Sequence, residues 1–199
     1  RHNAANKNAA TVKSVYSKTK ATSKMQQVFS GITRKAPVIE VSSVDSQVTE
    51  AENLVSTKQY VLAVDLIETM LKLRDLPTHH RANLLRLIGD SFTKLGDFEA
   101  GKNAYIQALE VDSYSVRSYI GLGTIALLKQ NFESAMVHFQ KAVSLAPEDE
   151  MTNLGLGLAF QGMKEFKESS SWVQKSLACN PDNTVAIFTL IQVSQEMND

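Results

Sequence analysis

The chain has 199 residues, of which 43% are hydrophobic and 21% charged, as is typical of a soluble helical domain with a tail. No apolar run approaches the roughly 18 residues that a membrane-spanning helix needs, so we expect no membrane span. A single cysteine, Cys179, excludes an internal disulfide framework and favours a reducing compartment, and we therefore expect a cytoplasmic protein.

The net charge of zero conceals two parts of opposite sign. Residues 1–39 contain eight Lys or Arg and no Asp or Glu, whereas residues 40–199 contain 13 Lys or Arg and 21 Asp or Glu. We interpret residues 1–43 as a basic, low-complexity arm or linker, since its small and polar residues bury little apolar surface. Three interpretations stay open: a solvated linker, an arm docked on the acidic remainder of the same or a second chain, and contact with nucleic acid or a membrane surface. Aromatic residues are sparse among its charges, so we do not expect a nucleic-acid partner.

One stretch of the arm has an apolar pattern of its own. Four apolar residues between Met25 and Ile32 would share one face of a short helix. Residues 36–44 read as extended, because the Pro37 ring disfavours helix just before it. We expect residues 25–40 to pack on the following domain or on a second copy of it.

The first pair of helices is expected over residues 44–77. Small and apolar residues recur there at helical spacing: Ala51, Leu54, Ala63, Ile67 and Met70. Four extra residues, Thr78 to Arg81, then lengthen the connection, and we assign His79 and His80 to this loop.

From Ala82 onward the sequence repeats every 34 residues. Glycine recurs at Gly89, Gly123 and Gly157. Phenylalanine recurs at Phe98, Phe132 and Phe166. A fixed period of this length indicates a stacked helical array. The full units are 82–115, 116–149 and 150–183.

Each unit predicts two amphipathic helices joined by a short turn. Counted from the first residue of a unit, the apolar positions 4, 7, 8 and 11, and then 17, 20, 24 and 27, have helical spacing. Small residues at positions 8 and 20 let the two backbones approach closely. A glycine inside a helix costs about 1 kcal/mol relative to alanine, so its recurrence at position 8 indicates that close packing offsets this cost.

The last part of the array departs from the pattern. Asn153, Ser169 and Ser176 replace apolar or small residues, which predicts poorer packing or a polar contact across the helix pair. A final helix over 184–199 is apolar nearly all round, so we expect it to be buried on several sides. Its cover would be a second chain, the basic arm or sequence beyond Asp199.

This pattern resembles the tetratricopeptide repeat, a helix–turn–helix unit of 34 residues. The resemblance is most specific in 82–115 and 116–149, is weaker in 150–183, and covers 44–199 with 44–77 as a degenerate unit. It implies an all-α, right-handed superhelical solenoid of antiparallel helix pairs. In such proteins the first helix of each pair lines a concave groove that binds partners.

The resemblance also implies which residues line this groove, namely positions 2, 5, 9, 12 and 13 of each first helix. The predicted partner-binding groove comprises Asn83, Arg86, Asp90, Arg117, Ile120, Thr124, Leu127, Leu128, Met151, Leu154, Leu158, Val185 and Phe188. Its amino-terminal half is polar and its carboxy-terminal half is apolar. Because soluble monomers rarely expose a contiguous apolar patch, we expect a groove for an apolar or amphipathic segment, bound as a helix or an extended peptide. The alternative is a superhelix curled so tightly that these side chains bury one another.

Some members of the family hold an acidic carboxyl-terminal peptide with Lys, Asn and Arg in the groove. Asn83, Arg86 and Arg117 could act in this way, but Asp90 lies among them and would repel a carboxylate. We therefore do not expect that clamp here.

No motif predicts catalysis, a metal or a cofactor. The glycines around Gly121 and Gly155 resemble phosphate-binding loops, but no strand precedes them. The histidines and Cys179 lack the spacing of zinc ligands. We interpret Cys179 as a packing residue and Trp172 as part of the rim on the convex side.

The sequence thus predicts a non-catalytic protein–protein interaction scaffold or adaptor that binds a protein partner in its groove. The alternative is the carboxy-terminal regulatory region of a larger signalling or catalytic protein. Self-association through the final helix or the basic arm is a further hypothesis. We expect Leu127→Asp or Leu158→Asp to abolish partner binding while helix content survives.

Overall fold

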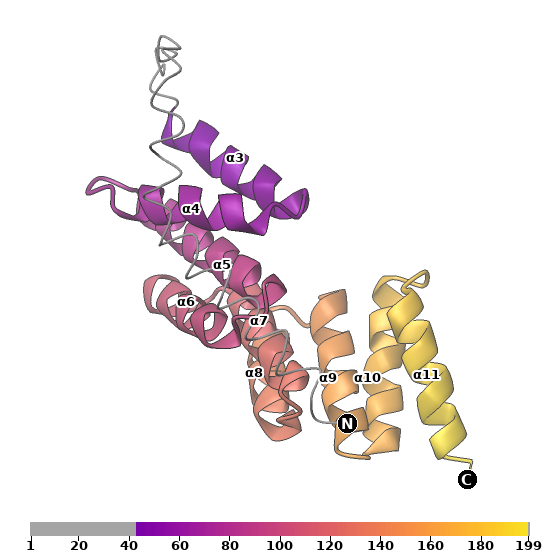
Figure 1. Ribbon diagram of the computed structural model, residues 1–199. Helices are drawn as coiled ribbons and strands as arrows, with labels where there is room; N and C mark the ends of the chain where they lie inside the picture. The colour runs from indigo at the N-terminus through magenta and orange to yellow at the C-terminus, as the bar shows by residue number, and fades with distance from the viewer. Residues whose placement is uncertain (1–42, 199) are drawn as a thin grey trace, which may run out of the picture.

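The computed structural model describes residues 43–198, and every regular element in this range is a helix (Figure 1). The helices stack in chain order from α3 at one end to α11 at the other. Their bounds are α3 Val44–Ser56, α4 Tyr60–Leu71, α5 Thr78–Lys94, α6 Phe98–Val111, α7 Val116–Leu128, α8 Phe132–Leu145, α9 Glu150–Gly162, α10 Phe166–Cys179 and α11 Thr184–Glu196. The prediction of an all-α solenoid is confirmed. The apolar helix and extended segment expected between residues 25 and 42 lie outside the described residues.

The connection before α5 is shorter than predicted. Thr78 to Arg81 form the first turn of α5, so the assignment of His79 and His80 to a loop is wrong. Pro77 directly precedes the helix, where its missing N–H carries no penalty. This turn is held to the preceding pair, because the Arg81 guanidinium donates to the carbonyls of Leu71 and Leu73 at 3.2 Å each.

Two of the three repeating glycines, Gly89 and Gly123, lie against an aromatic ring. A Cβ built on Gly89 would lie 2.7 Å from the Tyr105 ring, and one on Gly121 would lie 2.2 Å from the same ring. Phe139 fills the equivalent space one unit later, where Cβ atoms on Gly123 and Gly155 would lie 2.8 and 2.3 Å from its ring. The ring at position 24 therefore sits between a glycine of its own unit and one of the next. This arrangement joins consecutive units into one stack.

The unit 150–183 replaces part of this packing by hydrogen bonds. The Ser169 hydroxyl donates to the Gly157 carbonyl at 2.8 Å, and the Ser176 hydroxyl donates to the Glu150 carbonyl at 3.1 Å. The predicted polar contact across the helix pair is thus present between α9 and α10. Asn153 contacts the preceding loop instead, because its Nδ2 donates to the Pro147 carbonyl at 3.1 Å.

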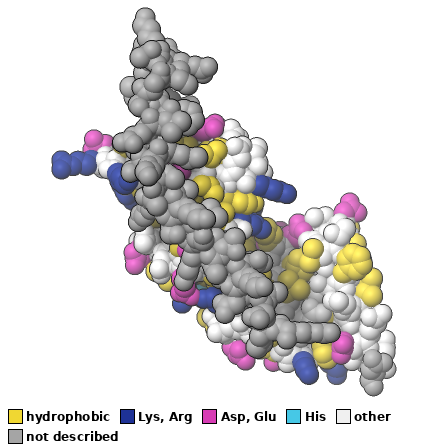
Figure 2. Space-filling view, viewed as in Figure 1, with side chains coloured by type: hydrophobic (Ala, Val, Ile, Leu, Met, Phe, Trp, Pro, Cys, Tyr) yellow, Lys and Arg dark blue, Asp and Glu magenta, His cyan; other side chains and the backbone are white. Residues whose placement is uncertain are grey.

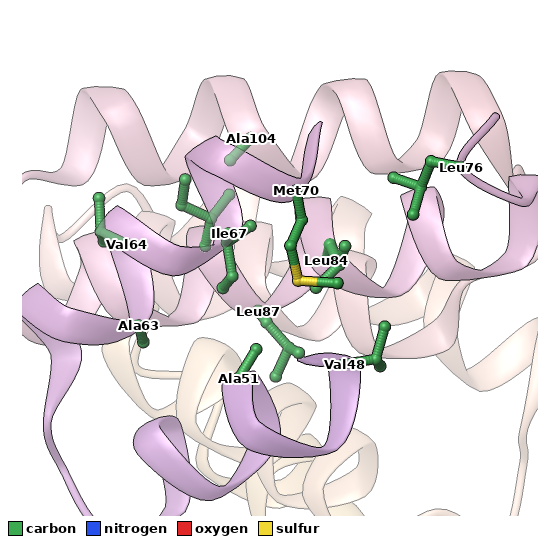
Figure 3. Packing of buried hydrophobic residues seen from close by; sticks show 11 residues of the cluster. Val48, Ala51, Ala63, Val64, Ile67, Met70, Leu76, Leu84, Leu87 and Ala104 are labelled. Carbon is green, nitrogen blue, oxygen red and sulfur yellow. The ribbon is translucent and has the colours of Figure 1, made fainter. Parts of the chain in front are cut away.

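The amino-terminal pair packs on α5 through a core of its own. Figure 3 shows Val48 and Ala51 of α3 and Ile67 and Met70 of α4 gathered against Leu84 and Leu87 of α5, all of them buried. The degenerate unit therefore forms an ordinary helix pair of the stack. Ala51 stands where the later units carry glycine.

Three further side chains differ from expectation or refine it. Cys179 is exposed at the end of α10, so its interpretation as a packing residue is wrong. Trp172 is half-buried against the core formed by α7, α8 and α9, and the Lys175 ammonium lies 3.6 Å from the centre of its ring. His138 is half-buried on α8, and burial, aided by the Lys102 charge, lowers its pKa.

Within the described range no helix is both long and apolar enough to cross a membrane.

Candidate functional site: a groove along the first helices

The predicted groove contains a cavity of about 430 Å³ between α5 and α7, which we call the groove cavity. It is lined by Val55, Tyr60, Arg86, Asp90, Thr93, Lys94, Tyr105, Arg117, Ile120, Gly121, Thr124, Leu128 and Met151. A second cavity of about 680 Å³, the edge cavity, shares Arg86 and Arg117 with it. The edge cavity lies where α5 and α7 begin and also includes Asn83 and His79.

The structure brings part of the predicted set together. The groove cavity includes Arg86, Asp90, Arg117, Ile120, Thr124, Leu128 and Met151. The remaining predicted apolar residues lie outside the lining of both cavities: Leu127, Leu154, Leu158, Val185 and Phe188.

Two of the predicted apolar groove residues contribute to the hydrophobic core. Ile120 is buried although it lines the cavity, and Leu127 packs against the core cluster of α7, α8 and α9. Leu128 and Met151, in contrast, expose 56% and 49% of their surfaces. The usable apolar surface of the groove cavity therefore lies on Leu128 and Met151.

A connected polar network extends from the lining of the groove cavity to α3. The Arg86 guanidinium donates to Asp90 Oδ2 at 2.6 Å and to Asn83 Oδ1 at 2.8 Å. Asn83 Nδ2 in turn donates to Glu52 on α3 at 2.8 Å. The network links α3 to α5, so it holds the Arg86 side chain in one orientation.

Tyr105 completes this network from α6. Its hydroxyl donates to Asp90 Oδ1 at 2.6 Å, while its ring fills the space between Gly89 and Gly121. Burial raises the pKa of Asp90, and the Tyr105 hydrogen bond and the Arg86 charge oppose this rise. Burial and the Asp90 charge raise the pKa of Tyr105, so the phenol remains a donor at neutral pH. The repeat pattern alone places Tyr105, at position 24, among the core residues. A tyrosine at a core position, with an acid at position 9 of the preceding helix, is the signal that could have identified it.

Asp90 is therefore not the unpaired acid that the sequence suggested. Both of its oxygens accept short hydrogen bonds, and Arg86 neutralises its charge. Arg117 and Lys94 line the same cavity, and neither forms an ion pair with any described residue. Arg117 instead contacts the Met151 sulfur at 3.5 Å. The cavity thus presents two cations that form no ion pair within the described residues, although the charges of both lower the pKa of Asp90, beside two exposed apolar side chains.

The other polar clusters of the described residues are less suited to binding a ligand than the groove cavity. His80 pairs with Asp45 at 2.7 Å, and its ring lies 4.0 Å from that of His79. The side chains of His, Cys, Asp and Glu in residues 43–198 do not gather in groups of three that could hold a metal ion.

Comparison with known proteins identifies the repeat. The family model described as tetratricopeptide repeat matches residues 82–114 and 116–149. Residues 82–114 and 116–149 are therefore tetratricopeptide repeats. The match covers the two units in which an aromatic ring at position 24 is held between glycines.

The curated relatives are much longer than this chain. Anaphase-promoting complex subunit 3 of Schizosaccharomyces pombe is 21% identical over 123 residues, which are 62% of this chain and 18% of that protein. The tetratricopeptide repeat-containing protein trd-1 of Caenorhabditis elegans is 27% identical over 90 residues, which are 45% of this chain and 12% of that protein. The chain therefore spans less than a fifth of the length of either relative.

Solved structures share the fold. The crystal structure of MamA matches with a TM-score of 0.61 and 17% identity over 76% of this chain and 83% of that one. The first tetratricopeptide repeat domain of Spaghetti (RPAP3), bound to the HSP90 peptide SRMEEVD, matches with a TM-score of 0.59 and 18% identity over 64% and 100%. The second such domain of human RPAP3, in complex with the HSP70 peptide SGPTIEEVD, matches with a TM-score of 0.56 and 19% identity over 59% and 98%.

Proposed function

We propose that this chain is a non-catalytic protein-interaction scaffold that holds a segment of a partner protein in the groove cavity. The observation that carries the proposal is that the exposed side chains of Leu128 and Met151 and the cations Arg117 and Lys94 line one cavity. An amphipathic segment fits this lining, with apolar side chains on Leu128 and Met151 and an acidic group near the two cations.

Two structural relatives support a protein segment as the ligand. The RPAP3 domains bind the peptides SRMEEVD and SGPTIEEVD, which are rich in acidic residues. In this chain Asp90 is paired with Arg86 and Tyr105, so its repulsion of an incoming acid is weaker than the sequence suggested. An acidic residue of the partner would be attracted by Arg117 and Lys94.

A second candidate is a regulatory repeat region within a longer protein. The observation in its favour is the greater length of the curated relatives, of which the chain covers 18% and 12%. In both candidate functions the groove binds a protein. The two differ in whether this binding changes the activity of an attached domain. Comparing the activity of the native full-length protein with and without a groove variant would separate them.

The test of the groove is a quantitative pull-down from the native cell with Leu128→Asp and Arg117→Glu. We expect each change to lower partner recovery about tenfold or more, because an unpaired charge on an apolar contact, or a repelled acid, costs about 1.4 kcal/mol or more. Leu127→Asp is unsuitable, since Leu127 packs on the core.

Val137→Asp is the matched control. Val137 is 58% exposed on α8 and lies outside the groove cavity, so this variant should retain the partner. Equal recovery with all three variants would show that the groove cavity is not the binding site.

A further inference from the structure

The groove cavity is positively charged although the helices around it are acidic. Residues 40–199 contain 13 Lys or Arg and 21 Asp or Glu, a net charge of −8. Among the described residues that line the groove cavity, three are cations and one, Asp90, is an acid, which leaves a net charge of +2. A cavity whose sign opposes that of the surrounding surface attracts anions that this surface repels. The charge of the groove cavity therefore indicates an anionic ligand group.

The far end of the predicted groove, on α11, carries no cation. From Thr184 to Asn198 the only charged residue is Glu196. Ala186 and Val193 are fully buried on α11 whereas Phe188 is 66% exposed, so the expectation of a helix buried on several sides is wrong for the described residues. Figure 2 shows hydrophobic side chains gathered over this end of the molecule. The positive charge of the predicted groove residues thus lies on α5 and α7.

The three cations of the groove cavity act on the same carboxylate. Burial raises the pKa of Asp90, and besides the Tyr105 hydrogen bond the charges of Arg86, Arg117 and Lys94 oppose this rise. Of the three, only Arg86 forms an ion pair with Asp90. Arg117 and Lys94 form no ion pair with any described residue. Two positive charges therefore converge on a place whose single acid is already paired.

Two guanidinium groups approach this place from different helices. Arg86 of α5 and Arg117 of α7 both line the groove cavity and the edge cavity, so they flank the passage between the two. The bonds of Arg86 to Asp90 and Asn83 fix its orientation, and a guanidinium has more N–H donors than these two bonds use. Each guanidinium presents its N–H groups as a fork that matches the oxygens of a carboxylate or a phosphoryl group.

The net charge of the lining favours a phosphoryl group over a carboxylate. A phosphorylated side chain carries about −1.5 to −2 charges at pH 7 and three acceptor oxygens, whereas Asp or Glu carries a single charge and two oxygens. A carboxylate would leave part of the +2 charge of the lining uncompensated, and a phosphoryl group would bring it close to neutral. A tetrahedral group also accepts hydrogen bonds from cations on several sides at once.

We propose that the groove cavity binds a partner protein through a phosphorylated side chain, which Arg86, Arg117 and Lys94 hold while its apolar neighbours contact Leu128 and Met151. This inference rests on the proposed function and adds to it the chemistry of the ligand. The partner segment is bound when it is phosphorylated and released when the phosphoryl group is removed.

The lining of the groove cavity favours a phosphorylated protein over other sources of phosphate. Bases of a single-stranded nucleic acid stack on accessible aromatic rings, but Tyr105 is buried and Tyr60 is half-buried. Leu128 and Met151 are exposed, as apolar side chains of a peptide require. The basic arm of residues 1–39 is no candidate for this cavity, because its eight cations would be repelled by those of the lining.

Three labelled peptide libraries test the proposal. Their flanking positions are random mixtures of apolar and polar residues, and the fixed central residue is phosphoserine, glutamate or serine. Fluorescence anisotropy measures the binding of each library to the full chain. We expect the phosphoserine library to bind about tenfold or more tightly than the glutamate library, because it offers a further charge and a further oxygen. Equal affinity for these two libraries, or no binding of the phosphoserine library, would overturn the proposal.

Two variants locate the phosphoryl group. Arg117→Gln should reduce the preference for phosphoserine over glutamate, since it removes one of the two flanking guanidinium groups. Lys141→Gln is the matched control, because Lys141 is exposed on α8 outside the lining of both cavities, and it should keep the preference. Circular dichroism establishes that each variant is folded, and Lys94→Gln replaces Arg117→Gln if it is not. An unchanged preference in the cavity variant would decide against this site.

A pull-down from the native cell separates this inference from the proposed function. One half of the lysate is treated with a protein phosphatase and the other half with the phosphatase and its inhibitor. We expect partner recovery to fall about tenfold after dephosphorylation, as the peptide affinities predict. A partner recovered equally from both halves, yet lost with Leu128→Asp, would overturn the phosphate inference and leave the proposed function intact. A partner lost on dephosphorylation but retained by Leu128→Asp would contradict both.

Discussion

At the scale of single residues, the fold depends on matching a ring with two glycines. Tyr105 and Phe139 each occupy space that a Cβ on the neighbouring glycines would fill. One period later Val173 takes the place of the ring, and Thr189 stands where Gly121 and Gly155 stood. A smaller side chain on one helix thus accompanies a larger one on the next, as dense packing requires.

This pairing predicts the behaviour of a double-mutant cycle. Gly155→Ala should destabilise the chain by about 1–3 kcal/mol, since its Cβ would lie 2.3 Å from the Phe139 ring. Phe139→Val alone should also destabilise by leaving a cavity. The combined variant should lose less stability than the sum of the two single losses, because the alanine methyl occupies space vacated by the ring. Denaturant unfolding measures all three, and strictly additive losses would contradict the packing described.

At the scale of elements, several helices begin with a side chain that caps them. Asp149 Oδ1 accepts from the Thr152 amide at 2.8 Å and from its hydroxyl at 2.7 Å at the start of α9. The side chains of Asp97, Asn131 and Asn183 each accept a hydrogen bond from a backbone amide in the first turns of α6, α8 and α11. The residue before α10, Glu165, makes no such bond. The cap satisfies an amide that the helix itself leaves unpaired.

Asp149→Ala should therefore lower the free energy of unfolding by about 1 kcal/mol, the usual effect of losing an amino-terminal cap. Glu165→Ala is the matched control at the equivalent position of the neighbouring helix, and its effect should stay within about 0.5 kcal/mol. Thermal or urea unfolding of both variants compares them directly. A loss as large for Glu165→Ala as for Asp149→Ala would show that the capping bonds do not stabilise the helix.

At the scale of the whole molecule, the stack is an array in which each helix contacts only near neighbours. The principal contacts of α11 within the described residues are with α9 and α10, and those of α3 are with α4 and α5. Stability in such an array approximates a sum of local terms. A substitution at one end should therefore lower the local stability mainly at that end.

Val193→Ala provides the test. Val193 is fully buried on α11, so the change should cost about 1–3 kcal/mol by leaving a cavity. Hydrogen exchange of the full chain should quicken in α9, α10 and α11, with α3 to α6 little altered. Leu156→Ala, fully buried in α9, is the comparison in the middle of the array and should quicken exchange over more helices. Uniform quickening from α3 to α11 in the Val193 variant would indicate an array that opens as one unit.

The sequence alone determined the helical period and most of the packing positions, because a repeat imposes the same local environment at each equivalent place. Gly89, Gly123 and Gly157 show why: each can be recognised from spacing alone, and each meets a side chain of the second helix. The repeat could not predict the start of α5, since Thr78 to Arg81 fall outside the 34-residue period.

Only the tertiary structure decided how the site is arranged. Leu127 and Leu128 are neighbours with the same chemistry, yet one packs on the core and the other is exposed in the groove cavity. Asp90 reads as an unpaired acid until Tyr105, 15 residues away on the next helix, is seen to donate to it. The apolar residues of α11 cannot reveal from their pattern which side is covered. These features depend on contacts between helices, and a single sequence specifies such contacts only through the three-dimensional fold.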